Sequence, residues 1–393
     1  MVKPGGSTCN LNCTYCYYLD KALQYGGCVQ KMQPEMLEEY IRQYCLAVKG
    51  PEITFCWHGG EPLVLGVDYY RKALKLIAKY ATGKKVFHSI QTNGVLINAE
   101  WAQFFAENHF LVGVSIDGPK DIHDAYRLNK GGKPTFDKVM AGIELLKRFK
   151  VEYNTLSVVS DLCAGRGAEI YRFFKSIGSH YMQFLPAVEH TVPANSIGKP
   201  SYNSFGRDII VPPTYPGASL ASWSIGAAEY GRFMCDIFDE WVKTDVGSYY
   251  VTLFDATLCQ YAGVQPGYCA MCESCGDDLI VEFNGDVYPC DHFVYPEYKL
   301  GNILSQSFEE IYRNPRRLQF GLEKRNSLPR ECLACKWYFA CRGECPKHRF
   351  EADGRNTLCE GLKMYFEHVD PYMQKMLTLI KQGLPPSQIM KTI

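Results

Sequence analysis

Three cysteines near the start of the chain have the spacing of a metal-cluster loop. Cys9, Cys13 and Cys16 form a C-x3-C-x2-C run. Thiolates held on one tight loop can bind a small inorganic cluster, and iron–sulfur clusters are held by cysteine thiolates. A four-iron cluster with three protein ligands leaves one iron open, and an open coordination position is where a substrate or cofactor binds. The alternative is a structural zinc knuckle, which needs a fourth ligand such as Cys28.

This run resembles the signature of the radical S-adenosylmethionine enzymes. The resemblance implies that the three cysteines hold a [4Fe-4S] cluster whose open iron chelates S-adenosylmethionine. It also implies reductive cleavage of that cofactor to methionine and a 5′-deoxyadenosyl radical.

Composition limits the class of protein. The chain has 393 residues, of which 47% are hydrophobic, enough for one large domain and a smaller one. Its 42 basic and 42 acidic residues balance, and no basic stretch indicates nucleic-acid binding. No apolar run has the length of a membrane span and no signal peptide precedes Cys9, so we expect a cytoplasmic protein with no membrane partner. In that reducing compartment, the 18 cysteines are expected to be cluster ligands or thiols rather than disulfides.

Short apolar runs alternate with amphipathic stretches over residues 1–190, which is the pattern of βα units. The predicted strands are 2–4, 53–57, 86–91, 111–116, 154–159 and 181–185. The predicted helices between them are 34–48, 68–81, 99–107, 136–149 and 167–177. Six such units predict an α/β fold with a partial (β/α)6 barrel of the TIM type, whose chemistry lies at the C-terminal ends of the strands.

Polar motifs follow five of these six strands. The cysteine loop follows the first strand, and His58-Gly-Gly-Glu61-Pro62 follows the second. Further motifs lie at 91–94, 115–118 and 183–186. Because parallel strand ends meet at one rim, we expect these motifs to surround one site.

Several rim residues resemble positions at which the radical enzymes bind S-adenosylmethionine. The Gly-Gly-Glu-Pro segment resembles the motif that holds the methionine amino group, and its glycines allow close backbone approach. Ser115 and Arg127, which follows a loop, resemble the pair that holds the ribose and carboxylate. Tyr18 and Leu185 match positions that touch the adenine. The alternative for the Gly-Gly-Glu-Pro segment is an ordinary turn, and the alternative for Arg127 is a surface arginine. Tyr18 and Leu185 could equally be barrel packing. The candidate cofactor-binding residues are Tyr18, Gly60, Glu61, Ser115, Arg127 and Leu185.

A second group of cysteines follows Cys259, and eight of them suit two four-cysteine clusters. Their pattern resembles the SPASM extension of radical enzymes that modify peptides and proteins. The resemblance implies an interleaved grouping of Cys269, Cys275, Cys290 and Cys345 on one cluster and of Cys332, Cys335, Cys341 and Cys359 on the other. Fully cysteine-ligated clusters suit electron transfer or structure. Cys272 could replace Cys269, and two zinc sites are the alternative. The six cysteines without ligand spacing, at 28, 45, 56, 163, 235 and 259, are expected to be buried thiols.

The predicted domains are a radical S-adenosylmethionine barrel over 1–225, a linking helix and strand over 226–258, and a SPASM module over 259–393. The barrel is expected to end in a long Pro- and Gly-rich loop, 190–225. Loops of that length are often functional. The module is expected to contain a hairpin around Asn284-Gly285 and a C-terminal helix over 360–381.

The combination of WHGGEP, SIDGP, YPCD and the C-terminal cysteine run resembles the anaerobic sulfatase-maturating enzymes over nearly the whole chain. The resemblance implies oxidation of a Cys or Ser of an unfolded or nascent sulfatase to Cα-formylglycine. It implies three [4Fe-4S] clusters, S-adenosylmethionine, an electron donor such as flavodoxin or ferredoxin, and a monomer. It assigns Asp291, which follows Cys290, as the general base and His58 to the substrate pocket.

Other functions fit parts of the pattern. Another SPASM-type enzyme could form thioether or carbon–carbon crosslinks in a peptide. A non-catalytic iron–sulfur electron carrier or a zinc-binding interaction protein would account for the cysteines but not for the polar rim. The sequence leaves open whether the target residue is Cys or Ser.

Overall fold

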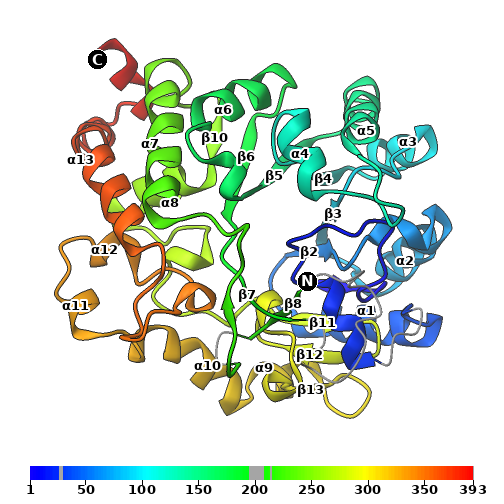
Figure 1. Ribbon diagram of the computed structural model, residues 1–393. Helices are drawn as coiled ribbons and strands as arrows, with labels where there is room; N and C mark the ends of the chain where they lie inside the picture. The colour runs from blue at the N-terminus through cyan, green and yellow to red at the C-terminus, as the bar shows by residue number, and fades with distance from the viewer. Residues whose placement is uncertain (26–29, 194–207, 213–214, 393) are drawn as a thin grey trace.

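The computed structural model describes residues 1–25, 30–193, 208–212 and 215–392 (Figure 1). Ten strands of these residues form one sheet in the order β10-β6-β5-β4-β3-β2-β1-β11-β12-β13. From β1 to β6 each strand pairs in parallel with the next, which confirms the partial barrel. The barrel strands are β1 Val2–Lys3, β2 Glu52–Trp57, β3 Lys85–Thr92, β4 Phe110–Ser115, β5 Tyr153–Val159, β6 Tyr181–Pro186 and β10 Tyr250–Val251.

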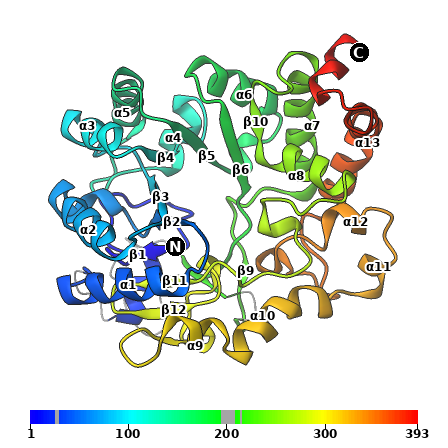
Figure 2. The same cartoon turned by 180° about the vertical axis from the view of Figure 1, so that it is seen from behind.

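Helices cover the outer side of these strands, and the views from the front and from behind agree (Figures 1 and 2). Local sequence sets their starts: Pro34 opens the first turn of α1, and the Asn98 side chain caps α3 by accepting a hydrogen bond of 2.9 Å from the Trp101 backbone N–H. The helices are α1 Pro34–Ala47, α2 Val67–Tyr80, α3 Ala99–Glu107, α4 Lys120–Tyr126, α5 Phe136–Arg148 and α6 Gly167–Ser176.

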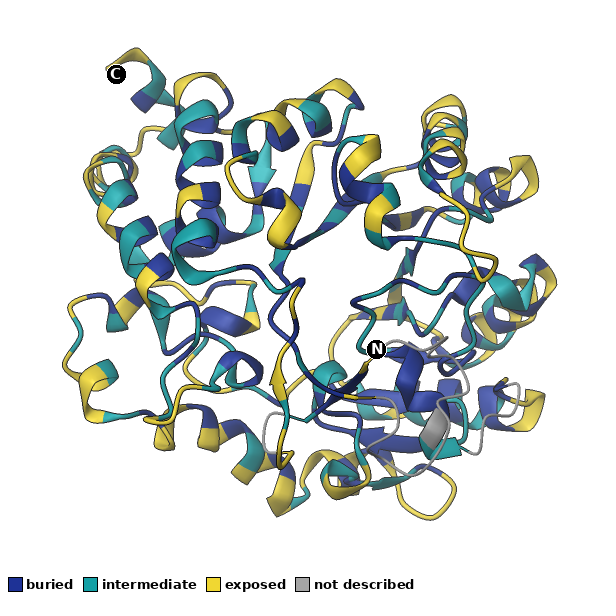
Figure 3. Ribbon diagram, in the orientation of Figure 1, coloured by how far each residue is buried: buried dark blue, intermediate teal, exposed yellow. Residues whose placement is uncertain are grey.

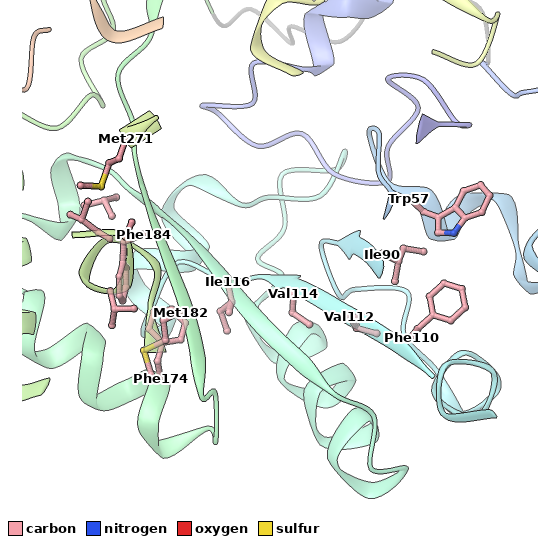
Figure 4. Packing of buried hydrophobic residues seen from close by; sticks show 14 of the residues in the cluster. Trp57, Ile90, Phe110, Val112, Val114, Ile116, Phe174, Met182, Phe184 and Met271 are labelled. Atoms are coloured by element: carbon pink, nitrogen blue, oxygen red, sulfur yellow. The ribbon is translucent and has the colours of Figure 1, made fainter. Parts of the chain in front are cut away.

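The core lies between the strands and the helices, and strand alternation decides which residues enter it. Val112 and Val114 on β4 are fully buried toward the helices, next to Ile90 of β3 (Figure 4). Because successive side chains point to opposite faces, Ser115 lies on the inner face of the barrel. The helices likewise turn their buried residues inward and their exposed residues outward (Figure 3).

The sheet continues without a break into the C-terminal module. Strand β1 pairs in parallel with β2 on one side and with β11, Ile280–Glu282, on the other. Strand β11 forms the predicted hairpin with β12, Asp286–Tyr288, where Gly285 has a φ of +84°. The last strand is β13, Gly301–Asn302, antiparallel to β12. The first barrel strand therefore lies at the junction of barrel and module.

The remaining helices follow the barrel in the chain. They include α7 Ala227–Thr244, α8 Thr252–Tyr261, α9 Phe308–Tyr312, α10 Pro315–Asn326, α11 Arg330–Leu333, α12 Tyr338–Cys341 and the predicted C-terminal helix, α13 Cys359–Lys381. Helices α7 and α13 lie side by side (Figures 1 and 2). Their approach requires Gly361, because a Cβ built there would lie 1.8 Å from the carbonyl oxygen of Ala227.

Two sequence expectations differ from the structure. The predicted loop 190–225 contains three short antiparallel strands, β7 His190–Val192, β8 Ile209–Val211 and β9 Ser219–Leu220, while 194–207 and 213–214 lie outside the described residues. These three strands are only two or three residues long, too short to show an alternation of apolar and polar residues. The segment before Arg127 is the helix α4 rather than a loop. No helix in the described part of the chain is both long and apolar enough to cross a membrane.

Candidate active site and cluster sites

Backbone hydrogen bonds to residues at the end of α4 hold the cysteine loop that follows β1. The Asn12 N–H donates to the carbonyl oxygen of Leu128 at 2.8 Å, and the Thr14 N–H donates to that of Tyr126 at 3.0 Å. Leu11, Tyr15 and Trp223 pack around the loop in one buried apolar cluster with Cys13. The loop is thus fixed, with Cys13 buried and Cys9 and Cys16 partly buried.

The three thiols of this loop lie close together. Burial and the charges of Glu61, Cys13 and Cys16 raise the pKa of Cys9 well above its usual range, which places the three sulfurs within electrostatic reach. The Leu11 N–H points at the Cys9 sulfur from 3.4 Å, as N–H groups do around cluster thiolates. Three converging thiols with an N–H donor fit a cluster with one open iron.

The Gly-Gly-Glu segment after β2 packs directly on the chain that leads into the cysteine loop. The Gly60 N–H donates to the carbonyl oxygen of Gly6 at 2.7 Å, and a Cβ at Gly60 would lie 2.3 Å from the carbonyl oxygen of Thr8. The Glu61 carboxylate is 1% exposed and points into the protein, where Leu63 N, Thr92 Oγ1 and Asn93 N donate to it.

Glu61 therefore joins the ends of β2 and β3, and its backbone N–H also donates to the carbonyl oxygen of Thr8 at 2.9 Å. Burial raises the pKa of Glu61 to about 7, against those three hydrogen bonds.

Arg127 is a buried residue rather than a surface arginine. It is 7% exposed and forms a two-pronged contact with Asp117, through Nε and Nη2 at 3.0 Å each. Tyr15 of the cysteine loop donates its hydroxyl to the same carboxylate. Ser115, on the inner face of β4, accepts a hydrogen bond of 3.0 Å from the Gln91 amide. Ser115 and Arg127 thus lie on two elements next to the cysteine loop.

Tyr18 and Leu185 lie in different places. The Tyr18 ring is 3% exposed, its hydroxyl donates to Glu282, and the ammonium of Lys3 lies 3.3 Å from its ring centre. Tyr18 thus contacts the module, and its side chain is committed there. Leu185 alternates with the buried Phe184 on β6, so it faces the inside of the barrel.

Asp291 lies at the junction of barrel and module. Its carboxylate forms an ion pair with the fully buried Lys3 of β1 and accepts a hydrogen bond from the Tyr17 hydroxyl. Burial alone would raise the pKa of Asp291, but the ammonium of Lys3 opposes it most strongly, and the pKa lies well below its usual range. The side chain remains 20% exposed. Asp291 is therefore an ionised and accessible carboxylate beside the cysteine loop.

His58 and His292 stay neutral beside this carboxylate. Burial lowers the pKa of His58 to about 4, and its Nδ1 accepts a hydrogen bond of 2.8 Å from the Gly59 N–H. Burial likewise lowers the pKa of His292, whose ring packs on Tyr17 at 4.8 Å. The structure thus brings His58 and Asp291 together from the ends of β2 and β12.

A second ion pair joins the barrel rim to the module. Lys347 forms a buried ion pair with Glu189, which follows β6, and the Lys347 ammonium lies 5.3 Å from the ring centre of Tyr17. Tyr17 therefore lies between two lysines and the Asp291 carboxylate. Pairing of both lysines offsets the cost of burying their charges.

The cysteines of the first predicted module set act on one another electrostatically. Burial, Asp291 and the thiols of Cys275 and Cys269 raise the pKa of Cys290 to about 12. Burial, Glu344 and the thiols of Cys290 and Cys269 raise the pKa of Cys345 well above its usual range. Cys290 and Cys345 therefore lie within electrostatic reach of each other and of Cys269.

The second set converges separately. Burial, Glu344 and the thiols of Cys359 and Cys332 raise the pKa of Cys341 to about 12, and Cys335 acts on both Cys332 and Cys359. The interleaved grouping of the two sets stays a prediction.

Cys272 lies three residues after Cys269 and contacts backbone carbonyls. Its sulfur contacts the carbonyl oxygens of Pro266 and Tyr268, at 3.6 Å each. Within the described residues, no three His, Cys, Asp or Glu side chains are close enough to hold a single metal ion. A zinc ion needs four ligands at about 2.0–2.3 Å, whereas a four-iron cluster holds its thiolates further apart. The thiol groups fit clusters better than zinc.

The cysteines without ligand spacing are buried or half-buried. Cys45, Cys163 and Cys235 are buried, Cys56 and Cys259 are partly buried, and Cys28 lies outside the described residues.

The partners that hold the candidate site residues in place were not predicted from the sequence. Lys3 was visible as a charge in a two-residue strand that is otherwise apolar. Asp117 was visible within the Ser-Ile-Asp-Gly motif. Tyr17, Glu189 and Lys347 carried no signal, because their spacing matches no motif.

Comparison with known proteins agrees with this geometry. The family model of the radical SAM superfamily matches residues 4–164, and that of the iron–sulfur cluster-binding SPASM domain matches 267–336. A serine-type anaerobic sulfatase-maturating enzyme of Bacteroides thetaiotaomicron is 47% identical over 399 aligned residues, covering 100% of this chain and 94% of that protein. The chain belongs to the anaerobic sulfatase-maturating enzyme family.

Other members agree in sequence and in structure. A cysteine-type anaerobic sulfatase-maturating enzyme of Clostridium novyi is 34% identical over 93% of this chain and 94% of that protein. A solved structure described as "Native anSMEcpe with bound AdoMet" superposes with a TM-score of 0.83 at 30% identity, covering 96% of this chain and 98% of that one. Membership of the family and both domain matches imply [4Fe-4S] clusters and S-adenosylmethionine as cofactors.

Proposed function

We propose that this protein is a radical S-adenosylmethionine oxidoreductase that converts a Cys or Ser of a sulfatase polypeptide to Cα-formylglycine. The 47% identity over the whole chain to a serine-type sulfatase-maturating enzyme carries the proposal. The ionised Asp291 beside the cysteine loop supports it, because removal of two electrons from a side chain also requires a proton acceptor.

Three groups of residues hold the cofactors in this proposal. Cys9, Cys13 and Cys16 hold one [4Fe-4S] cluster, and the two module sets hold the others, with Cys269 rather than Cys272 in the first set. The backbone at Gly60 and Glu61, the Ser115 hydroxyl and the inner face at Leu185 contact S-adenosylmethionine. Arg127 and Tyr18 border that site, and both are already paired within the protein. When bound, cluster and cofactor together supply the radical that removes a hydrogen atom from the substrate Cβ.

The protein's own groups perform the remaining steps. Asp291 accepts the proton of the substrate hydroxyl or thiol through the carboxylate that Lys3 and Tyr17 hold in place. Because its pKa lies well below the usual range, Asp291 is ionised at every physiological pH, as a proton acceptor must be. His58, neutral and next to Asp291, lines the substrate pocket and presents its Nε2–H.

The partners and the organisation of the chain follow from this reaction. A low-potential donor such as flavodoxin or ferredoxin supplies the first electron, and the protein acts as a monomer in the reducing cytoplasm. The barrel of 1–225 starts the reaction, 226–258 links the two parts, and the module of 259–393 supplies the base. The substrate is a sulfatase segment in an unfolded or nascent state, because its target side chain must enter the rim.

The test is an anaerobic assay with two sulfatase-motif peptides that differ only in Ser or Cys at the target. Because the relative with 47% identity is a serine-type enzyme, we expect the Ser peptide to be converted. Asp291→Asn should lower formylglycine formation by about 10² to 10⁴-fold while 5′-deoxyadenosine is still released. Asp353→Asn, an exposed acid of the same module, is the control. Unchanged formylglycine from Asp291→Asn would refute the base, and deoxyadenosine without any peptide product would refute the substrate.

A further inference from the structure

Asn93, in the polar motif that follows β3, contacts both the cysteine loop and the Gly-Gly-Glu segment. This asparagine is buried, with 8% of its surface exposed. Its backbone N–H donates to the Glu61 carboxylate at 2.7 Å. Its side-chain Nδ2 donates to Asn10 Oδ1 at 2.7 Å and to the Cys9 sulfur at 3.8 Å. One residue thus connects the carboxylate after β2 with the first cysteine of the loop.

The hydrogen bonds of Asn93 fix which end of its amide faces the sulfur. Its Oδ1 accepts a hydrogen bond of 3.1 Å from the Val95 N–H, so the amide oxygen points along its own chain. The two N–H bonds of Nδ2 then point at the cysteine loop, where Asn10 takes one and the Cys9 sulfur takes the other. The chain turns directly afterwards at Gly94, whose φ of +76° glycine adopts without strain. The side chain is therefore held in one orientation.

Two N–H donors from different elements point at the Cys9 sulfur. The Leu11 N–H lies 3.4 Å away on the loop itself, and the Asn93 amide comes from the end of β3. Hydrogen bonds to the sulfurs are among the factors that set the reduction potential of an iron–sulfur cluster. Reduction adds one negative charge, and an N–H donor stabilises the more negative state. The Asn93 amide therefore favours the reduced state of a cluster held by Cys9.

We propose that Asn93 is a positioning residue of the radical-generating site, where its amide raises the reduction potential of the cluster held by Cys9, Cys13 and Cys16. The proposal rests on the proposed function, which assigns these ligands. One electron leaves the donor and enters this cluster, so a higher potential makes the cluster easier for the donor to reduce. Asn93 acts on this electron transfer through the Cys9 sulfur.

The two contacts of Asn93 can be tested separately. Its backbone N–H holds Glu61, whereas its side chain holds Cys9. A substitution at this position keeps the backbone N–H and removes only the contact with the sulfur. The backbone of Gly60 and Glu61, which borders S-adenosylmethionine in the proposed function, therefore keeps its support while the cluster ligand loses a donor.

Two variants measure the effect of the side-chain amide. Asn93→Leu has nearly the shape of asparagine and no donor. Asn108→Leu is the matched control, because the half-buried Asn108 also donates its amide to a carbonyl oxygen, that of Phe104 at 2.7 Å, but precedes β4 at the opposite end of the barrel. Each protein is reconstituted anaerobically, its iron is counted, and its clusters are titrated by electron paramagnetic resonance at set potentials. S-adenosylmethionine binds at an open iron, so the signal that changes on its addition belongs to the first cluster.

We expect Asn93→Leu to make reduction of the first cluster about tenfold less favourable, a fall of about 59 mV for one electron. The auxiliary clusters should be unaffected, and Asn108→Leu should match wild type. Release of 5′-deoxyadenosine should fall with a weak donor and recover with excess titanium(III) citrate, because a stronger reductant compensates for the lower potential. A purely structural defect would not recover in this way. An unchanged potential in a fully loaded Asn93→Leu protein would overturn the proposal.

A measurement on unsubstituted Asn93 covers the case in which Asn93→Leu loses iron. Protein made with ¹⁵N in its asparagine side-chain amides is reduced and measured by pulsed electron paramagnetic resonance. The first cluster should show a coupling to ¹⁵N. The coupling should remain when Asn10→Asp and Asn12→Asp are combined, because this variant lacks the other asparagine amides of the loop and keeps the oxygen that accepts from Asn93. Absence of the coupling overturns the proposal.

Failure of the proposed function gives different results. If no signal of the wild-type protein responds to S-adenosylmethionine, the assignment of Cys9, Cys13 and Cys16 fails, and this inference fails with it. A responsive first cluster without any formylglycine refutes the substrate assignment and leaves this inference in place. A responsive first cluster whose potential is insensitive to Asn93→Leu refutes the inference alone.

Discussion

Replacement of Asp117 by Asn tests whether the barrel and the cysteine loop are held by one buried carboxylate. Asp117 accepts hydrogen bonds from Arg127 Nε and Nη2, from Val158 N and from the Tyr15 hydroxyl. The Arg127 and Asp117 side chains are 9% and 2% exposed. Asparagine has nearly the same shape but no charge, and its amide cannot accept at both ends. The substitution therefore leaves the buried guanidinium of Arg127 without an anion.

The expected cost follows from that burial. Breaking a buried ion pair by removing one partner costs about 3–5 kcal/mol, because the other charge stays uncompensated. An exposed pair contributes about 0–1 kcal/mol. Asp68, paired with Arg71 at 2.8 Å and 85% exposed, is an exposed pair of the same kind in this chain. Asp117→Asn should therefore destabilise the protein several times more than Asp68→Asn.

Anaerobic urea unfolding followed by far-ultraviolet circular dichroism measures both variants against wild type. Iron analysis in parallel should show loss from Asp117→Asn, because Tyr15 lies between Cys13 and Cys16 and loses its partner. An Asp117→Asn protein within about 1 kcal/mol of wild type, with full iron, would refute the reasoning.

Two further predictions concern packing and pH. Gly361→Ala would place a Cβ 1.8 Å from the Ala227 carbonyl oxygen, so α13 must move away from α7. We expect a loss of about 1–3 kcal/mol of stability. We also expect loss of iron from the site of Cys332, Cys335, Cys341 and Cys359, since Cys359 begins α13; thermal unfolding and iron analysis like wild type would contradict this. Burial lowers the pKa of His88 to about 4, against about 6.5 in an unfolded chain. Only the unfolded state binds this proton between those values, so stability falls as pH falls from 6.5 to 4. Urea unfolding should show a weaker pH dependence in His88→Phe than in the exposed-site control His109→Gln, and equal slopes would contradict it.

The sequence predicted those parts of the fold and site that repeat or lie close along the chain. The six barrel strands alternate with helices, and their motifs lie within a few residues of each strand end. The cysteine sets were recognisable because ligand spacing is local. The resemblance also indicated the interleaving of Cys345 with the earlier cysteines, which spacing alone could not.

The rest depends on contacts between distant residues. Lys3 and Asp291 are remote in sequence and meet only because β1 pairs with β11. The inward turn of Glu61 and the burial of Arg127 depend on partners at Thr92 and Asp117, which no periodicity reveals. The strands β7 to β9 are too short to have a pattern. In the sequence, Lys324 cannot be distinguished from an exposed helix lysine. Its burial depends on the turn at Cys269, which packs against it.

The place of β1 in the sheet has a consequence for biosynthesis. Val2 pairs with Trp57 on one side and with Val281 on the other, so one edge of the first strand stays open until residue 281 of 393 has been made. At about 5–20 residues per second, that wait is about 14–56 seconds on the ribosome. A contact of such sequence separation is also slow to form. The carboxylate and the cysteine loop therefore come together late, and a truncated chain has its first cluster loop but no base beside it.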